Sequence, residues 1–325
     1  MFSAMGVRQL SRHPSFWQVD RDANLALVEE AERAGVMNHP LTITYYGYNG
    51  FIIRSGDHKL AIDPGAKLFL LGLGPVIPRQ DWNGVTHVLV THADPDHYWH
   101  ADRLLAHCGA PLVCGDELIE ITDGRAFMAH PRRPKLDYSI LVERAYPLRQ
   151  GELVDLDGVQ VRSIPAFHGD LRLSFMFGAV RKTVVREPDT LFAKGETGFV
   201  IELGGVTVAN LGDSLLMPDW EGLRPHVLMI PIGGREIGNT MDEDHALEAV
   251  TSIQPKLVIP CHYDCGVLFR KNANPADAQS FKRRCEAVGV DCVLLEPGQS
   301  TTYLENTQLS LVEARGGPGV PTSVS

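Results

Sequence analysis

Short hydrophobic runs separated by turn residues fill most of the chain, a pattern typical of β-strands. Residues 41–45 alternate hydrophobic and polar side chains, and residues 51–54 and 59–63 flank a Ser-Gly-Asp turn. Residues 87–91 form a continuous hydrophobic run, which indicates a strand buried on both faces. A further short strand is expected at residues 112–114. These segments predict a sheet in the first half of the chain.

The second half of the chain repeats this pattern. Two hairpins are predicted, at residues 153–164 and 198–211, because in each a hydrophobic run turns back through Asp-Gly or Gly-Gly. Residues 226–232 and 256–260 are hydrophobic runs of the buried type. Strands in hairpins combined with strand–helix–strand units indicate an α/β protein of stacked layers.

Helices are predicted between these strands. Residues 101–106 follow the first buried run, and residues 241–253 separate the last two strands. The second of these helices has a start signal, because Thr240 precedes it and Glu243 stands three residues later, as in a capping box. Another helical pattern covers residues 22–34.

We expect a single domain over residues 41–305, since no linker-like stretch interrupts it. Residues 1–40 are an N-terminal extension with one helix, which would be marginal alone and is expected to pack on the body. Residues 306–325, rich in Gly, Pro and Ser, are expected to be disordered.

Charge and hydropathy limit the partners. The 325 residues include 40 acids and 30 bases, a net charge of -10, which argues against a nucleic-acid or anionic-membrane surface. A bound cation would still attract a small anionic substrate. No stretch approaches the ~20 apolar residues that cross a bilayer, and the N-terminus lacks the apolar core of a signal peptide. We expect a small-molecule substrate, no nucleic acid and no membrane insertion, with a homo-oligomer left open.

The six cysteines are scattered and do not form a disulfide framework. We therefore expect a cytoplasmic protein with reduced thiols. Cys261 and Cys265 flank a histidine, but no second cysteine pair has the spacing of a zinc ribbon. We interpret both as small buried residues.

Four potential metal ligands stand together directly after the first buried run: His92, Asp94, Asp96 and His97. A loop at a strand end lets neighbouring side chains converge on one point, which the alternating directions of a strand prevent. Imidazole with carboxylate suits Zn, Mn or Fe rather than Ca. The alternative is a solvated polar turn with two unrelated histidines.

Other strand ends favour the metal interpretation. His168, Asp213 and His262 each follow a hydrophobic run in the second half of the chain. Asp63 follows a fourth run and is placed to orient a ligand by hydrogen bonding. One such residue at a strand end is usually structural, whereas the same feature at five strand ends is difficult to attribute to chance.

Taken in order, these motifs resemble the metallo-β-lactamase superfamily. The motifs are Asp63-Pro64-Gly65, then Thr91-His92 with Asp94, Asp96 and His97, then His168, Gly212-Asp213 and Pro260-Cys261-His262. Within the superfamily, the sequence is most similar to small metal-dependent hydrolases related to ascorbate-6-phosphate lactonase, above all over residues 229–263.

The resemblance implies a four-layer αβ/βα sandwich with two positions for divalent metal ions at one edge of the inner sheets. It places one ion between His92, Asp94 and His168, and the other between Asp96, His97 and His262. It makes Asp213 the bridge between them and a hydroxide between the ions the nucleophile. Two cations lower the pKa of a bound water and stabilise the oxyanion that its attack creates.

Asp94 departs from the family pattern, which has histidine there. A carboxylate adds negative charge and a harder donor, so it should shift the preference from Zn towards Mn or Fe. Two alternatives stay open: the first site is weakened and a single ion binds, or His100 replaces Asp94 as ligand. We favour a surface or supporting role for His100.

Residues 170–197 are the expected substrate cover. Hydrophobic residues followed by three bases suit a substrate with a hydrophobic part and an anionic group, and a packed loop with solvated charges is the alternative.

We expect hydrolysis of an ester, lactone, amide or phosphoester, with Asp94, Asp96 and Asp213 tuning the water and receiving its proton. Within this chemistry, the second choice is a phosphodiesterase or phospholipase-D-like activity. A di-iron redox enzyme and a non-catalytic metal-binding protein are the alternatives from other classes.

Overall fold

The computed structural model describes residues 39–67, 74–133, 135–169, 172–176, 179–183, 191, 193–236, 238–266 and 272–304. The helix expected over residues 22–34 and the tail expected at residues 306–325 lie outside these ranges. Of the expected substrate cover, the backbone of two strands and a few residues near its end are described.

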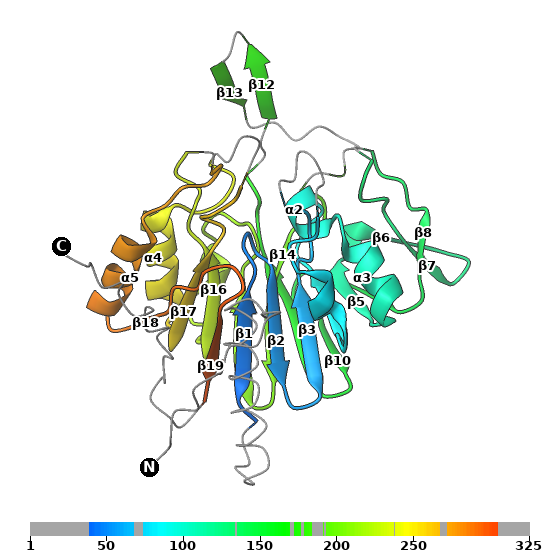
Figure 1. The fold of residues 1–325 in the computed structure, drawn as a ribbon, viewed down its shortest axis with the longest axis horizontal. Coiled ribbons are helices and arrows are strands. Elements are labelled where there is room, and N and C mark those ends of the chain that lie inside the picture. The colour runs from blue at the N-terminus through cyan, green and yellow to red at the C-terminus, as the bar shows by residue number, and fades with distance from the viewer. Residues whose placement is uncertain are drawn as a thin grey trace, which may run out of the picture.

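Two seven-stranded sheets form the centre of the molecule (Figure 1). In spatial order, the first consists of β19 (Ser300–Tyr303), β1 (Leu41–Tyr45), β2 (Phe51–Ser55), β3 (His58–Ile62), β4 (His87–Val90), β5 (Leu112–Gly115) and β9 (Ala145–Leu148). The second consists of β10 (Leu153–Leu156), β11 (Val159–Pro165), β14 (Thr197–Leu203), β15 (Val206–Asn210), β16 (Val227–Pro231), β17 (Leu257–Cys261) and β18 (Asp291–Cys292).

Each sheet begins with antiparallel strands and ends with parallel ones. In the first sheet, β19, β1, β2 and β3 are antiparallel, and β3, β4, β5 and β9 are parallel. In the second, β10, β11, β14 and β15 are antiparallel, and β15 to β18 are parallel. The continuous hydrophobic runs of the sequence became the parallel strands β4, β16 and β17, because helices cover their outer faces and leave no polar side.

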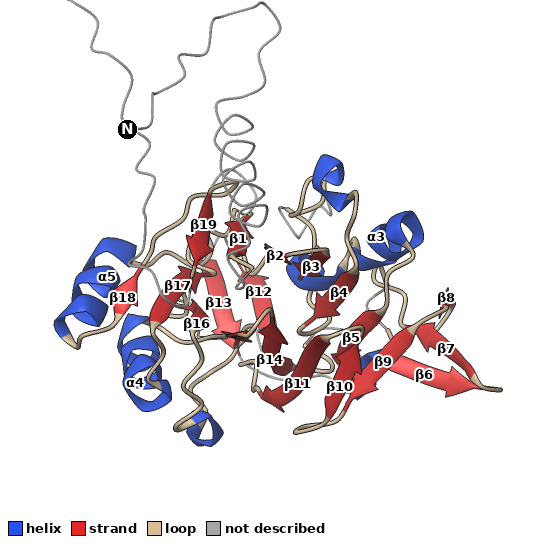
Figure 2. Cartoon of the chain, turned by 90° about the horizontal axis from the view of Figure 1, so that it is seen from below, coloured by secondary structure: helices blue, strands red, loops and turns tan. Residues whose placement is uncertain are grey.

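The helices lie on the outer faces of the two sheets. They are α2 (Pro95–Tyr98), α3 (Ala101–Cys108), α4 (Glu243–Ile253) and α5 (Ala278–Ala287), with short 3-10 turns η2 (Arg79–Trp82), η3 (Asp116–Leu118) and η4 (Pro218–Trp220). In Figure 2, α3 lies on one flank and α4 with α5 on the opposite flank, with the strands between them. The predicted four-layer α/β sandwich is confirmed.

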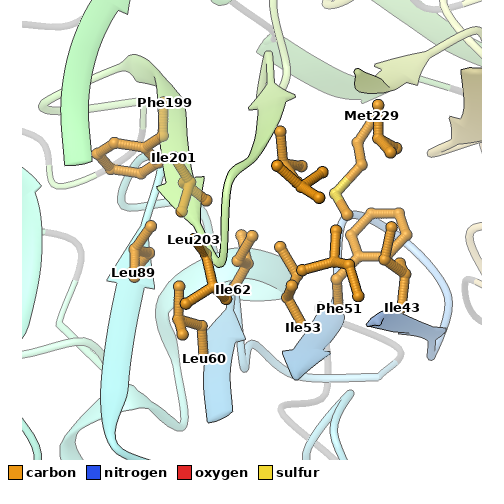
Figure 3. Packing of buried hydrophobic residues seen from close by; sticks show 14 of the residues in the cluster. Ile43, Phe51, Ile53, Leu60, Ile62, Leu89, Phe199, Ile201, Leu203 and Met229 are labelled. Carbon is orange, nitrogen blue, oxygen red and sulfur yellow. The ribbon is translucent and has the colours of Figure 1, made fainter. Parts of the chain in front are cut away.

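Three hydrophobic clusters join the four layers. The largest lies between the sheets, where residues such as Ile53, Leu60 and Phe199 are fully buried (Figure 3). A second cluster packs α3 against the first sheet, and a third packs α4 and α5 against the second sheet. Because each side chain of this size contributes about 1.5–3 kcal/mol when buried, the clusters fix the relative position of the two sheets.

The start of α4 differs from the prediction. Asp242, not Thr240, is the N-cap, and its Oδ1 accepts hydrogen bonds from the backbone N–H groups of Asp244 and His245. The Thr240 hydroxyl instead donates to the carbonyl of Ser214. Asp and Thr are both good N-caps, so the sequence alone did not separate the two positions.

Several elements have no strong signal in the sequence. A three-stranded sheet contains β6 (Ile119–Thr122), β7 (Arg125–Met128) and β8 (Ile140–Val142). A two-stranded hairpin, β12 (Arg172–Met176) with β13 (Ala179–Thr183), falls within the expected substrate cover. This hairpin stands apart from the sheets at the end of the molecule where α2 lies (Figure 1). No helix among the described residues is long and apolar enough to cross a membrane.

Candidate metal centre

The predicted site residues all follow strand ends at one edge of the two sheets. In the first sheet, Asp63 follows β3, and His92 stands two residues after β4. In the second sheet, the site residues that follow strands β11, β15 and β17 are His168, Asp213 and His262. The strand directions therefore bring together residues that are up to 199 positions apart in the sequence, from Asp63 to His262.

One group of side chains contains Asp96, His97, Asp213 and His262, with one potential ligand atom from each within 4.8 Å of the others. His262 Nε2 lies 2.8 Å from Asp213 Oδ2 and 3.3 Å from Asp96 Oδ2. His97 Nε2 lies 3.4 Å from Asp213 Oδ2 and 3.5 Å from Asp96 Oδ2. All four residues are buried.

A second group contains His92, His168 and the same Asp213. His168 Nε2 lies 3.8 Å from Asp213 Oδ2, and the rings of His92 and His168 are 4.8 Å apart at their centroids. The two groups therefore share one carboxylate, as expected of a bridging ligand.

Asp94 lies beside the second group without belonging to it. Its Oδ2 is 3.5 Å from His168 Nε2 and 3.8 Å from His92 Nε2. Its Oδ1 accepts a hydrogen bond from the backbone N–H of Ala193, at 2.5 Å. One oxygen thus faces the histidines while the other holds the backbone just before β14. A side chain with two oxygens on one carbon can serve both partners.

Asp63 orients His97, as the sequence predicted. Asp63 Oδ2 lies 2.7 Å from His97 Nδ1 and accepts a hydrogen bond from the Thr91 hydroxyl. Its Oδ1 accepts the backbone N–H of Thr91, the residue that precedes His92. When Nδ1 of His97 donates to a carboxylate, the neutral imidazole presents the lone pair of Nε2 towards Asp96 and Asp213.

Close backbone approaches hold these loops in place. A Cβ at Gly65 would lie 1.8 Å from the carbonyl oxygen of Asp96, so only glycine lets the turn after Asp63 pack on α2. A Cβ at Gly233 would lie 2.2 Å from the carbonyl oxygen of His262. Glycine at position 233 is therefore a packing requirement of the His262 loop.

Burial and mutual charge shift the pKa values of these groups in opposite directions. Burial lowers the pKa of His92 well below its ordinary value, and the neighbouring His97 and His168 add to the effect. Burial also disfavours the charged forms of His97, His262 and Asp213. The attraction between their opposite charges has the larger effect on their pKa values. Asp213 keeps the pKa of both imidazoles well above the ordinary value, and they hold the pKa of Asp213 well below it. Without a metal, the centre therefore holds protons that a cation would displace.

The residues fit a divalent ion. Nε2 of His92, His97 and His168 and Oδ1 of Asp213 are buried and have no hydrogen-bond partner among the described residues. Buried polar atoms are normally paired, and each unpaired one costs about 1–3 kcal/mol. Imidazole nitrogens and carboxylate oxygens at these separations are the donor set that Zn, Mn and Fe prefer.

His100 does not join either group of potential ligands. It is 4% exposed, at the start of α3, and neither of its ring nitrogens has a hydrogen-bond partner in the described part of the chain. Of the two non-ligand roles expected for His100, burial excludes the surface one, and the supporting role stays a prediction. The structure gives no support to His100 as a replacement for Asp94.

His245 and the cysteines lie outside both groups of potential ligands. His245 is exposed and contacts the cap residue Asp242. Cys261 and Cys265 are buried, as expected, and all six cysteines are free.

Sequence reasoning missed two buried amides beneath the centre, Asn49 and Asn210. Asn49 donates to Asp63 Oδ2 at 2.7 Å and exchanges hydrogen bonds with Asn210. Asn49 precedes a glycine in the turn between two strands, where asparagine is the ordinary turn residue, so the sequence carried no sign of a further role.

The sequence model of the family described as "Beta-lactamase superfamily domain" matches residues 42–262. A UPF0173 metal-dependent hydrolase from Methanopyrus kandleri is 27% identical to this chain over 266 residues, which are 80% of this chain and 99% of the relative. The narrower resemblance to the ascorbate-6-phosphate lactonase branch stays a prediction.

Two solved structures show the same fold. Igni18, a metallo hydrolase from Ignicoccus hospitalis, is similar with a TM-score of 0.59 and 22% identity, over 82% of this chain and 99% of that one. CmlA, a diiron β-hydroxylase from Streptomyces venezuelae, is similar with a TM-score of 0.55 and 14% identity, over 81% of this chain and 53% of that one. At these identities the likeness concerns the fold alone. With the family match over residues 42–262, the chain belongs to the β-lactamase superfamily.

Proposed function

We propose that this hydrolase of the β-lactamase superfamily cleaves an ester, lactone, amide or phosphoester of a small molecule at a centre of one or two divalent ions. The observation that carries the proposal is the pair of buried ligand groups that share Asp213. A metal-dependent hydrolase from Methanopyrus kandleri that aligns along nearly its whole length supports the same chemistry.

We assign the ligands from these groups. His92 and His168 would hold one ion, Asp96, His97 and His262 the other, and Asp213 would contact both. Asp94 would complete the first position through Oδ2, the oxygen that faces His168. Divalent ions bound there would supply a hydroxide from water near neutral pH and stabilise the oxyanion formed by its attack.

The chain's own carboxylates would handle the proton. Asp96 and Asp94 lie on the more exposed side of the centre, with side chains 11% and 21% exposed, whereas Asp213 is 2% exposed. Because Asp94 is the most exposed of the three carboxylates and Asp213 the most buried, Asp94 is better placed than Asp213 to pass a proton to solvent. We therefore propose Asp94 as the proton acceptor and Asp213 mainly as a ligand.

The first experiment is metal analysis of protein purified without added metal, followed by turnover of lactones, esters, amides and phosphodiesters with Mn, Zn or Fe. We expect one or two ions per chain and hydrolysis of at least one of these substrate classes. Two irons with a visible charge-transfer band and no hydrolysis would instead favour the redox alternative.

Ligand substitutions test the assignment of residues. His168→Ala and His262→Ala should each lose bound metal and activity, because each removes a donor from a different group. His245→Ala is the matched control, since this histidine is 59% exposed and lies outside both groups. Full metal content in both ligand variants would show that the ligand set is wrong.

A further inference from the structure

We infer that Asn49 is a positioning residue that joins the two halves of the metal centre and sets the affinity of both metal positions. Asn49 touches none of the proposed ligands by hydrogen bonding, and it acts through the residues that hold them. The inference rests on the proposed function, because it presupposes that the two ligand groups bind ions.

Asn49 lies in the turn between β1 and β2, and its side chain is fully buried. Its Nδ2 donates to Asp63 Oδ2 at 2.7 Å and to Asn210 Oδ1 at 3.0 Å. Its Oδ1 accepts from Asn210 Nδ2 at 3.2 Å and from Cys261 Sγ at 3.3 Å. The Asn49 amide thus makes two hydrogen bonds as a donor and two as an acceptor. A buried amide whose donors and acceptors are all paired has a single favourable orientation.

The partners of Asn49 belong to different sheets. Asp63 follows β3 of the first sheet, whereas Asn210 and Cys261 are the last residues of β15 and β17 in the second. Hydrogen bonds are directional, so those at the end of the sandwich add a specific alignment to the hydrophobic packing that holds the two sheets together. The side chain therefore fixes the register of the two sheets at the edge where the ligands meet.

Each partner is one step from a ligand. Asp63 is hydrogen-bonded to Nδ1 of His97. It also accepts hydrogen bonds from the backbone N–H and the hydroxyl of Thr91, the residue that precedes His92. Asn210 Oδ1 also accepts the backbone N–H of Gly212, which precedes Asp213. Cys261 precedes His262. Asn49 is thus connected to ligands of both proposed metal positions and to the carboxylate they share.

The loss of this amide should affect metal binding more than folding. Without the Asn49 donor, Asp63 keeps Thr91 and His97 but can turn, and Asn210 loses its reciprocal partner. Removing a hydrogen-bond partner of a metal ligand typically weakens metal binding by about 10–100-fold, and Asn49 supports Asp63, which is such a partner of His97.

The test uses Asn49→Leu, a side chain of similar size without hydrogen bonds, and Leu203→Ala as its control. Leu203 is buried in the same inter-sheet core at the far end of β14, about 20 Å along the strand from Thr197. The Leu203 variant should lower the melting temperature without touching the amide network. Metal affinity is measured by chelator competition in the full-length protein, and the visible spectrum is recorded with Co²⁺.

For Asn49→Leu, we expect both dissociation constants to rise by about 10–100-fold and the Co²⁺ bands to shift. Leu203→Ala should keep wild-type dissociation constants and spectrum although it melts earlier. If Asn49→Leu does not fold, Asn49→Ala gives the same comparison without added bulk.

Wild-type affinities and an unchanged Co²⁺ spectrum in a folded Asn49 variant would overturn the inference. An equal loss of affinity in Leu203→Ala would also overturn it, because general destabilisation would then be the cause. If the wild-type protein itself bound no ion in the same titration, the proposed function would fail, which is a result distinct from either of these.

Discussion

At the scale of single residues, Asp94 decides how this centre differs from one with histidine at that place. Its two oxygens have separate partners, the amide of Ala193 on one side and the imidazoles of His168 and His92 on the other. A histidine has one nitrogen on each side of a rigid ring and would not reproduce both contacts. The Asp94 carboxylate therefore connects the candidate metal position with the backbone segment before β14.

Asp94→His should shift the metal preference from Mn or Fe towards Zn, because imidazole is a softer donor and carries no negative charge. Competition between Mn²⁺ and Zn²⁺ in one titration measures the ratio of affinities, which should change by about tenfold or more. Asp94→Asn is the control for the Ala193 contact, since it keeps an oxygen but removes the charge. An unchanged Mn-to-Zn ratio in Asp94→His would exclude Asp94 as a ligand.

His100 gives a pH-dependent prediction that is independent of the metal. Burial lowers its pKa to about 4 from 6.5, so the unfolded chain binds a proton there at pH values where the folded chain does not. The stability from the neutral His100 is then complete above pH 6.5 and is lost as the pH falls towards 4, by an amount on the order of 3 kcal/mol. In metal-free protein, the melting temperature of His100→Phe should fall less with decreasing pH over this range than that of the wild type. Substitution of the exposed His107 on the same helix should leave this fall unchanged, and equal slopes in all three proteins would refute the prediction.

The convergence of the candidate ligands could be predicted from the sequence because each follows a hydrophobic run that forms a strand, and the strand ends meet at one edge. The supporting residues could not. Asn49 stands in an ordinary turn, and its partners Asn210 and Cys261 lie 161 and 212 positions further along the chain. The contact of Asp94 with Ala193 spans 99 positions, and no local sequence pattern indicates it. Hydrogen bonds between distant loops depend on the complete packing of both sheets.

At the scale of elements, helix α4 shows how a local signal is settled by tertiary contacts. The capping-box pattern predicts Thr240 as the N-cap. The Thr240 hydroxyl instead donates a hydrogen bond to the carbonyl of Ser214, on the loop that carries Asp213. The helix therefore begins two residues later, where Asp242 is free to cap it. The strands of the two hairpins were easier to predict, because alternation and turn residues act within a few positions.

Asp242→Ala should destabilise the fold by about 1 kcal/mol, the usual cost of losing an N-cap. The side chain satisfies two backbone N–H groups and contacts His245, and these interactions hold its pKa below the ordinary value although burial opposes this. Urea unfolding measures the difference. Asp244→Ala, which removes an exposed ion pair with Arg284 and a negative charge from the first turn of α4 but no N-cap, should cost about half as much or less. Equal costs would mean that charge near the helix start, rather than capping, stabilises α4.

At the scale of the whole molecule, the metal centre is a junction between two halves that otherwise meet through hydrophobic side chains. His92, Asp96 and His97 come from the first sheet, and His168 and His262 come from the second. The hydrophobic contacts between the sheets are numerous but not directional. Ions bound between the two sets would therefore add the directional contacts that hold the sheets together at this edge.

Removal of metal should lower the stability of the entire fold, because ions that bind only the folded chain stabilise it by mass action. With free ion at about a thousand times its dissociation constant, the gain is about 4 kcal/mol, or roughly 6 °C in melting temperature for a chain of this size. Metal-loaded and chelator-treated protein should differ in urea midpoint but not in the slope of the transition, since the surface exposed on unfolding is the same. In His262→Ala, metal-loaded and chelator-treated protein should differ little in urea midpoint. This variant lacks the candidate ligand that follows β17 of the second sheet. If chelation left the wild-type midpoint unchanged, the two sheets would be held without the ions, and the centre would serve chemistry alone.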